Sequence, residues 1–232
     1  KINNSVYILS VKEWNMDFWL KRFLWNPFKS VGLKLNFLKN KISIVLLISI
    51  YLIGLYCNYF QENIPAGLFE NLPTVFSFIG LILILKAFAE KGDALWAWCF
   101  VIAGQFFITI SIALLNEDFG HNHILIYLSG SCISAIVGFF CLKKLKAIDN
   151  NIHLSQFHGY VYEQPALGFV FLLSCLGLVG LPFTPTFIGI DLLFSHIHKH
   201  EEVLIIFTTL SFLFIEISVL RIYARLFMGQ HK

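Results

Sequence analysis

The sequence predicts an all-α fold, a polytopic membrane bundle of about six to seven transmembrane helices with one broken helix near Pro182 to Asp191. Three observations predict it. The 232 residues are 57% hydrophobic and only 13% charged, with a mean hydropathy of +0.74, which lies outside the range of ordinary soluble domains. Apolar runs recur at a length that can cross a bilayer, about 20 residues each. Basic residues flank alternate ends of these runs.

The apolar runs define the expected crossings. Six are long enough, at residues 42–60, 72–89, 94–115, 124–142, 166–181 and 203–228, and the broken piece 182–198 lies between the last two. Lysine- and arginine-containing junctions alternate with acidic or neutral ones. The positive-inside rule therefore predicts six full crossings with both termini cytoplasmic. We expect an integral, multi-pass protein of a bacterial inner membrane. A full crossing by 182–198 alone would break this parity at the C-terminal end.

Residues 1–41 form a separate amphipathic segment before the bundle of residues 42–232. Tryptophan, phenylalanine and leucine interleave there with lysine and arginine, a pattern that suits the surface of an anionic leaflet. The segment is either a lateral or docking helix or a connector lying on the membrane surface. The first residue is Lys1, and no signal-peptide pattern opens the chain, so we expect a processed or partial chain or one piece of a larger polypeptide.

The stretch 177–193 is apolar enough for a membrane but cannot form one regular helix. Pro182 and Pro185 remove backbone donors, and Gly180 loosens the chain before them. An unpaired backbone group in hydrocarbon costs several kcal/mol, so such a break is tolerated where it is buried in protein or lines a wet cavity. Asp191 follows the break, and Glu216 is the second carboxylate well inside apolar sequence. Each is either part of a proton relay or a neutral acid bonded to nearby backbone.

Four further polar residues lie in or beside the apolar runs. Arg221 and Arg225 are spaced i to i+4, and they either snorkel to the interface or, for Arg221, pair with an acidic group on a neighbouring helix. Lys86 is either a channel lysine or a snorkelling one, and the interfacial sequence just beyond it favours snorkelling. Gln105 is expected to form a hydrogen bond across helices.

Other kinds of site find little support. The five cysteines lie in apolar runs without metal-ligand spacing, and the chain has no Gly-rich phosphate loop, nucleophile elbow or Cys-x-x-Cys pair. The run His196, His198, His200 lacks companion ligands and is better interpreted as interfacial or pH-sensitive. The net charge of +3 is too small to imply nucleic acid. We expect no metal, no cofactor and no active site of the soluble type, and we interpret the polar loop 143–165 as a cytoplasmic connector.

Residues 178–193 resemble the signature of the antiporter-like subunits of respiratory complex I and of Mrp-type sodium/proton antiporters. There an apolar helix runs into Ala-Gly-Ile-Pro-Pro and then Gly-Phe-Phe-Ser-Lys-Asp-Glu-Ile-Leu; this chain has Val-Gly-Leu-Pro-Phe and then Thr-Phe-Ile-Gly-Ile-Asp-Leu-Leu-Phe. The family lysine position is Ile190. Residues 220–229 resemble the family ending Phe-Arg-Leu-Tyr-Phe-Leu-Thr-Phe-Phe-Gly, with Arg221 at the family arginine, and Gln105 lies in a stretch similar to the family's Ile-Ser-Gln-Leu-Gly helix.

The resemblance implies a C-terminal half of a membrane subunit that works with other membrane subunits in a proton- or cation-translocating complex. Asp191, Glu216 and Arg221 would then form the ion path beside the helix break. One alternative is a non-conducting subunit that anchors partner proteins, since the relay lysines of the family are missing here. Another is proton-coupled inorganic-carbon uptake, because some relatives pair with a soluble zinc protein resembling a carbonic anhydrase.

Overall fold

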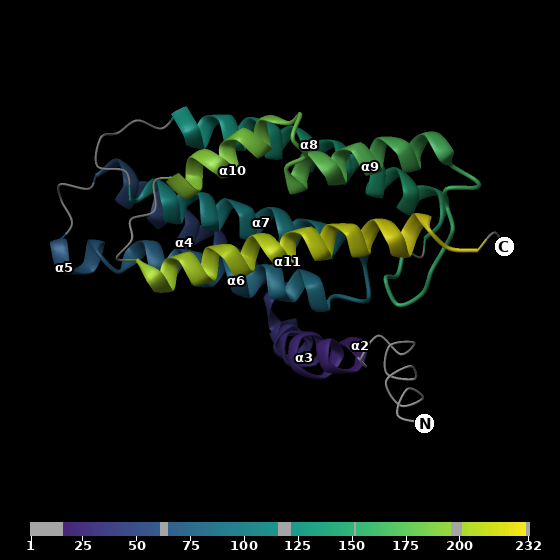
Figure 1. Ribbon diagram of the computed structural model, residues 1–232, viewed down its shortest axis with the longest axis horizontal. Coiled ribbons are helices and arrows are strands. Elements are labelled where there is room, and N and C mark those ends of the chain that lie inside the picture. The colour runs from purple at the N-terminus through teal and green to yellow at the C-terminus, as the bar shows by residue number, and fades with distance from the viewer. Residues whose placement is uncertain (1–15, 61–64, 116–121, 151, 196–200, 231–232) are drawn as a thin grey trace, which may run out of the picture.

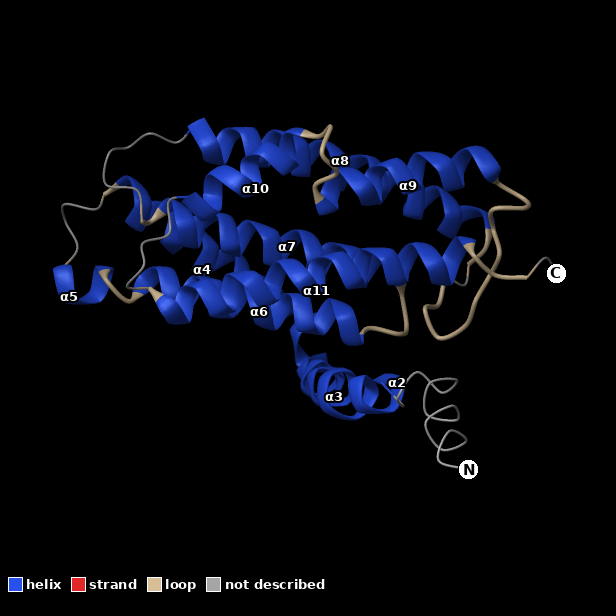
Figure 2. Cartoon of the chain, viewed as in Figure 1, coloured by secondary structure: helices blue, strands red, loops and turns tan. Residues whose placement is uncertain are grey.

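The computed structural model describes residues 16–60, 65–115, 122–150, 152–195 and 201–230, and all regular secondary structure in these ranges is helical (Figure 2). The predicted all-α class is confirmed. The elements are α2 (Met16–Trp19), η2 (Leu20–Trp25), α3 (Asn26–Lys34), η3 (Leu35–Lys39), α4 (Lys41–Tyr59), α5 (Ala66–Phe69), α6 (Leu72–Ala89), α7 (Ala94–Ala113), α8 (Asn122–Ile148), α9 (Pro165–Val179), α10 (Pro185–Ser195) and α11 (Glu202–Phe227).

Five of these helices, α4, α6, α7, α8 and α11, are long and apolar enough to cross a membrane. Their ends lie within two residues of the predicted runs, except that α8 continues six residues further, to Ile148. The remaining predicted run, 166–181, forms only α9, which has 15 residues and is too short to cross by itself. The expectation of six full-length helices is therefore corrected to five, and a further crossing needs α9 and α10 together.

Helices α9 and α10 lie end to end along α8, which runs in the opposite direction (Figure 1). Both pack against α8: Gly177 of α9 lies against Ser134, and Gly189 of α10 lies against Tyr127. At about 1.5 Å per residue, 15 and 11 residues give about 22 and 16 Å, enough together for a hydrocarbon core of about 30 Å. The two short helices together are therefore long enough for one crossing, and six crossings with both termini on one side stay a prediction.

The break itself falls at residues 180–184, so the predicted position near Pro182 is confirmed. Gly180 has φ +91°, and the amides of Gly180 and Leu181 both donate to the Leu176 carbonyl, at 3.1 and 3.0 Å. This left-handed cap is one that glycine adopts without steric cost. Pro185 begins α10, where a proline loses no helical hydrogen bond. The break was predicted to extend from Pro182 to about Asp191. Asp191 instead lies inside α10, as its seventh residue.

Close contacts between backbones hold the bundle together in two connected layers. In one layer α6 packs against α7 and α11, and a Cβ atom added to either Gly80 or Gly104 would lie 3.1 Å from the other's carbonyl oxygen. In the other layer α8 packs against α9 and α10, and a Cβ atom at Gly130 would overlap Thr186. Small residues allow helices to approach this closely. Such van der Waals packing drives helix association in a membrane, because lipid tails are as apolar as the side chains and leave no hydrophobic driving force.

The first crossing and the segment before it lie at the margin of the bundle. Only 11% of the α4 span is buried, against 67% for α6 and for α7. The described part of the amphipathic segment is helical and packs beside the C-terminal half of α6 (Figure 1). Gly32 lies against Leu85 and Ala89, and Trp25 stacks on Phe88 with 5.3 Å between ring centroids. The segment is therefore attached to the bundle from α3 onward.

The alternation of helix directions brings the ends of α6, α8 and α11 and the start of α7 to one end of the bundle (Figure 1). We call it the basic end. Its cationic residues are Lys86, Lys91, Lys143, Lys144, Lys146, Arg221 and Arg225. The described charges beside the opposite ends of α6 and α11 are acidic, at Glu70, Glu201 and Glu202. The charge alternation expected from the sequence is thus present along the long axis.

Candidate functional site

The three residues expected to form an ion path do not meet. Asp191 on α10 and Glu216 on α11 are both exposed on the outer surface of the chain, and neither forms a hydrogen bond or ion pair within the described residues. Arg221 bonds elsewhere: its guanidinium donates to the backbone carbonyls of Phe88 and Glu90. The described residues therefore offer Arg221 no ion pair with Glu216.

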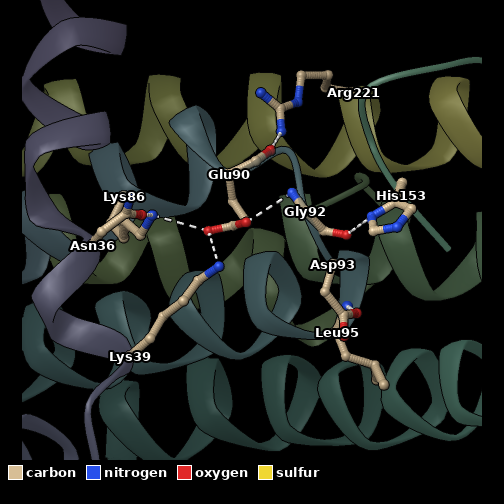
Figure 3. A network of polar contacts seen from close by, with 9 residues as sticks. All are labelled: Asn36, Lys39, Lys86, Glu90, Gly92, Asp93, Leu95, His153 and Arg221. Atoms are coloured by element: carbon tan, nitrogen blue, oxygen red, sulfur yellow. Dashed lines mark hydrogen bonds and ion pairs between the residues drawn. The ribbon is translucent and has the colours of Figure 1, made fainter. Parts of the chain in front are cut away.

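The buried charges gather instead where α6 ends. Lys86 is 1% exposed, and its Nζ lies 2.9 Å from Glu90 Oε2 and donates to Asn36 Oδ1 at 2.6 Å (Figure 3). Lys39 Nζ lies 2.7 Å from the same Glu90 oxygen. We call Asn36, Lys39, Lys86, Glu90 and Arg221 the α6–α7 cluster. The expectation that Lys86 snorkels to water is wrong, because Glu90 and Asn36 bind its ammonium group inside the protein.

Glu90 is the centre of this cluster. Its side chain is 4% exposed, with Oε2 facing two ammonium groups and Oε1 accepting the Gly92 amide at 2.8 Å. Burial by itself would raise the pKa of Glu90, but hydrogen bonds from Lys39, Lys86 and the Gly92 amide outweigh it and lower the pKa to about 2. Glu90 is therefore a carboxylate at neutral pH, and it carries one charge between two cations.

Local sequence places these groups together. Lys86 and Glu90 are one helical turn apart, so they share a face of the chain as α6 ends. Glu90 is the C-cap, with extended backbone, and its amide donates to the Ala87 carbonyl at 3.2 Å, so the other carbonyls at the helix end need donors from elsewhere. Arg221 from α11 donates to the Phe88 carbonyl of the last turn and to the carbonyl of Glu90 itself, and a cation at a helix C-terminus is favoured by the helix dipole. The end of α6 is thus closed by cations from two directions.

The turn after Glu90 is fixed by the loop that follows α8. Asp93 caps α7 by accepting the Leu95 amide at 2.9 Å, and it pairs with Lys146 at 2.5 Å. The His153 ring bonds the Gly92 carbonyl, and the Leu154 amide donates to the Lys91 carbonyl at 2.9 Å. The loop expected to be a connector therefore also holds the α6–α7 turn in place.

Gln105 forms the cross-helix hydrogen bond that the sequence predicted. Its Nε2 donates to the Leu178 carbonyl at 3.1 Å. In a regular helix that carbonyl would accept the amide of residue 182, but Pro182 has none. Gln105 of α7 thus satisfies a carbonyl that the break leaves unpaired. Ile190, at the family lysine position, lies beside the same break: a Cβ atom added to Gly180 would be 2.8 Å from its Cδ1.

Metal ligands do not cluster in the part of the chain that the structure describes, where no group of three His, Cys, Asp or Glu side chains is placed to hold an ion. His196, His198 and His200 lie outside the described residues. Sequence reasoning missed Asn36, Lys39 and Glu90 as parts of a site. The spacing of Lys86 and Glu90 was a usable signal, but nothing in the sequence links residues 36 and 39 to residue 90.

These features define a class: a helical integral membrane protein with a broken crossing and a buried cluster of charges at its basic end. The chain is 27% identical over 172 residues to NADH-quinone oxidoreductase subunit N of Campylobacter fetus subsp. fetus (strain 82-40). The match covers 73% of this chain and 36% of the relative, so the chain spans little more than a third of that protein's length. No family model matches the chain, and no solved structure matches it. The similarity supports, in a coarse form, the resemblance to antiporter-like subunits of complex I.

Proposed function

We propose that this chain is part of a membrane subunit of a proton- or cation-translocating complex, and that the α6–α7 cluster is its site of proton or ion exchange at the basic end. The similarity to a subunit of NADH-quinone oxidoreductase supports the kind of complex. One observation carries the choice of site: Lys86 and Glu90 are ionisable, 1% and 4% exposed, and in contact at the end of an apolar membrane helix. Ionisable groups in such places are costly and commonly mark ion pathways.

The cluster has the chemistry for exchange. Lys39 is 30% exposed and Lys86 is 1% exposed, and both face one Glu90 oxygen, so the carboxylate connects a cation near solvent with one sealed in the protein. Deeper polar groups are neutral in the described α6–α11 interface, where the Ser77 and Thr208 hydroxyls lie 3.1 Å apart. The cluster would therefore act at the mouth of a path, with other groups of the complex continuing it.

Asp191 and Glu216 enter the proposal in a different place. Both are exposed on the outside of the bundle, so an ion path through them would run between this chain and a neighbouring polypeptide of the complex. Arg221 is proposed as a positioning residue, because it holds the carbonyls of Phe88 and Glu90 and so fixes the turn that carries the Glu90 carboxylate.

Ion flux per assembled complex tests the proposal. In membrane vesicles containing the whole complex, Lys86→Gln should lower flux at least tenfold. This is a lower bound, because one proton-transfer group typically contributes about 100-fold or more to a rate. The exposed Lys143→Gln, which removes the same charge at the same end, should leave flux within about twofold. Unchanged flux in an assembled Lys86→Gln complex would overturn the assignment.

A second candidate is the non-conducting anchoring subunit. It is favoured by one feature of the cluster: Asn36 and Lys39 come from η3, so the same contacts that bury Lys86 also attach the amphipathic segment to the bundle. In that case Lys86→Gln would reduce the amount of assembled complex and leave the flux of each remaining complex unchanged. Inorganic-carbon uptake with a soluble zinc partner stays a prediction, which a co-purifying zinc protein would support.

A further inference from the structure

A second polar feature of the basic end is a pocket of about 510 Å³ between α3, the end of α6, α11 and the loop after α8. Of the α6–α7 cluster, only Arg221 lines it, and five cationic side chains are among its lining residues. They are Lys21, Lys29, Lys91, Arg221 and Arg225. No carboxylate lines the pocket in the described part of the chain.

Within the described residues, no lining carboxylate balances the positive charge of this pocket. Glu90, the carboxylate closest in sequence to the lining residue Lys91, already faces Lys39 and Lys86. Burial, and then repulsion by Lys91, Arg221 and Arg225, lowers the pKa of Lys29. Like charges held this close are unfavourable unless an anion joins them.

Two of the cations are held in place before any ligand arrives. Arg221 is fixed by the carbonyls of Phe88 and Glu90, and Arg225 lies 4.2 Å over the Phe157 ring. Lys91 is exposed, so its side chain can close on a ligand. Arginines fixed in this way lose little entropy on binding, and arginine and lysine are the usual partners of phosphate groups.

The surroundings of the pocket are those of a lipid surface. Trp25 and Phe88 line its wall, and the helices leading into it expose large apolar side chains: Phe18 is 55%, Trp19 55% and Phe23 63% exposed. An amphipathic segment of this kind lies at the boundary between headgroups and acyl chains. A ligand in the pocket would thus have its charged part among cations and its apolar part beside exposed aromatic rings.

We propose that this pocket binds the headgroup of an anionic glycerophospholipid, with preference for a lipid that carries two phosphates. Five cations exceed what a single phosphate neutralises, and basic pockets between membrane helices are suited to such headgroups. The assignment is independent of ion translocation, since Arg221 is the one residue that the pocket shares with the α6–α7 cluster, and it holds equally for an anchoring subunit.

Lipid titration of the purified, delipidated complex tests this proposal, with bound lipid counted by native mass spectrometry. The probes are cardiolipin, phosphatidylglycerol and phosphatidylcholine. The double variant Lys29→Gln/Arg225→Gln should weaken cardiolipin binding roughly 30-fold, since each cation near an anionic lipid contributes a little over fivefold, about 1 kcal/mol. The control Lys143→Gln/Lys144→Gln removes the same charge from exposed positions outside the pocket and should change binding by less than about twofold.

Several outcomes would overturn the inference. Equal losses in the two double variants would indicate only a diffuse attraction to the basic end. Displacement of cardiolipin by inorganic pyrophosphate or by an acidic peptide at the same concentration would point to a soluble anion or a protein partner instead. If the double variant does not assemble, the exposed Lys91→Gln alone should still weaken cardiolipin binding roughly fivefold, and no change there would also refute the site.

Discussion

Helix α10 of the broken crossing and the α6–α7 turn each carry a carboxylate in apolar surroundings, yet the two carboxylates have opposite environments. On α10, Asp191 is exposed and forms no polar contact within the described chain. After α6, Glu90 is 4% exposed and faces two lysines and an amide. The difference lies in the partners: α3 and η3 cover the end of α6, whereas no described element covers the outer face of α10. A buried charge needs a second element to enclose it.

The largest expected effect is on stability at the α6–α7 turn. Glu90→Ala leaves Lys86 buried without its counter-ion, and breaking a buried pair in this way costs about 3 to 5 kcal/mol. The measurement is the unfolding midpoint of the detergent-solubilised protein against wild type. A loss below about 1 kcal/mol would mean that water or another group already compensates Lys86, and that Glu90 is not the centre of the cluster.

The pH dependence of stability provides a second test of the role of Glu90. The pKa of Glu90 is depressed from 4.5 to about 2 in the folded protein, so its contribution to stability is complete above pH 4.5 and is lost as the pH falls towards 2. Glu90→Gln cannot titrate at this position. The stability difference between wild type and Glu90→Gln should therefore narrow between pH 4.5 and 2, and a difference that stays constant over this range would contradict the assignment.

An intermediate effect is expected at the break. Gln105→Leu removes the donor to the Leu178 carbonyl, and a buried acceptor left unpaired costs about 1 to 3 kcal/mol. The loss is measured by the same unfolding assay. The matched control is Ser129→Ala, which removes an exposed hydroxyl bonded within its own helix and should cost less than about 0.5 kcal/mol. Equal costs for both variants would show that water replaces Gln105.

The smallest effect on stability is expected at Asp191. Asp191→Asn changes an exposed side chain without a described partner, so stability should change by less than about 0.5 kcal/mol. Flux of the assembled complex is the second readout. A fall in flux with unchanged stability would mean that a neighbouring polypeptide makes Asp191 part of an ion path. The difference between exposed Asp191 and buried Glu90 would then hold for the isolated chain but not for the assembled complex. A large loss of stability would contradict the exposed placement.

Much of this fold could be predicted from the sequence, because hydropathy and proline positions act locally. The bounds of α6 and the break near Pro182 follow from which residues tolerate lipid and which lack an amide. The orientation of side chains could not be predicted in the same way. Helix α6 is apolar on all sides, so its sequence does not mark an inner face, and Lys86 looked interfacial. The pairing of Glu90 with Lys39 depends on a contact between residues about fifty positions apart, which no local pattern encodes.

The segment between α9 and α10, which begins at the left-handed cap of Gly180, is where this crossing can change in length. Gly130 and Ser134 of α8 are four positions apart, whereas the residues that they contact, Thr186 of α10 and Gly177 of α9, are nine positions apart. The five surplus residues loop out between the two short helices, which keep their own contacts with the unbroken α8. Insertions or deletions within residues 180–184 can therefore be absorbed without sliding either α9 or α10 along α8. The break is thus the part of this crossing where the chain can gain or lose residues over evolution without repacking its helices.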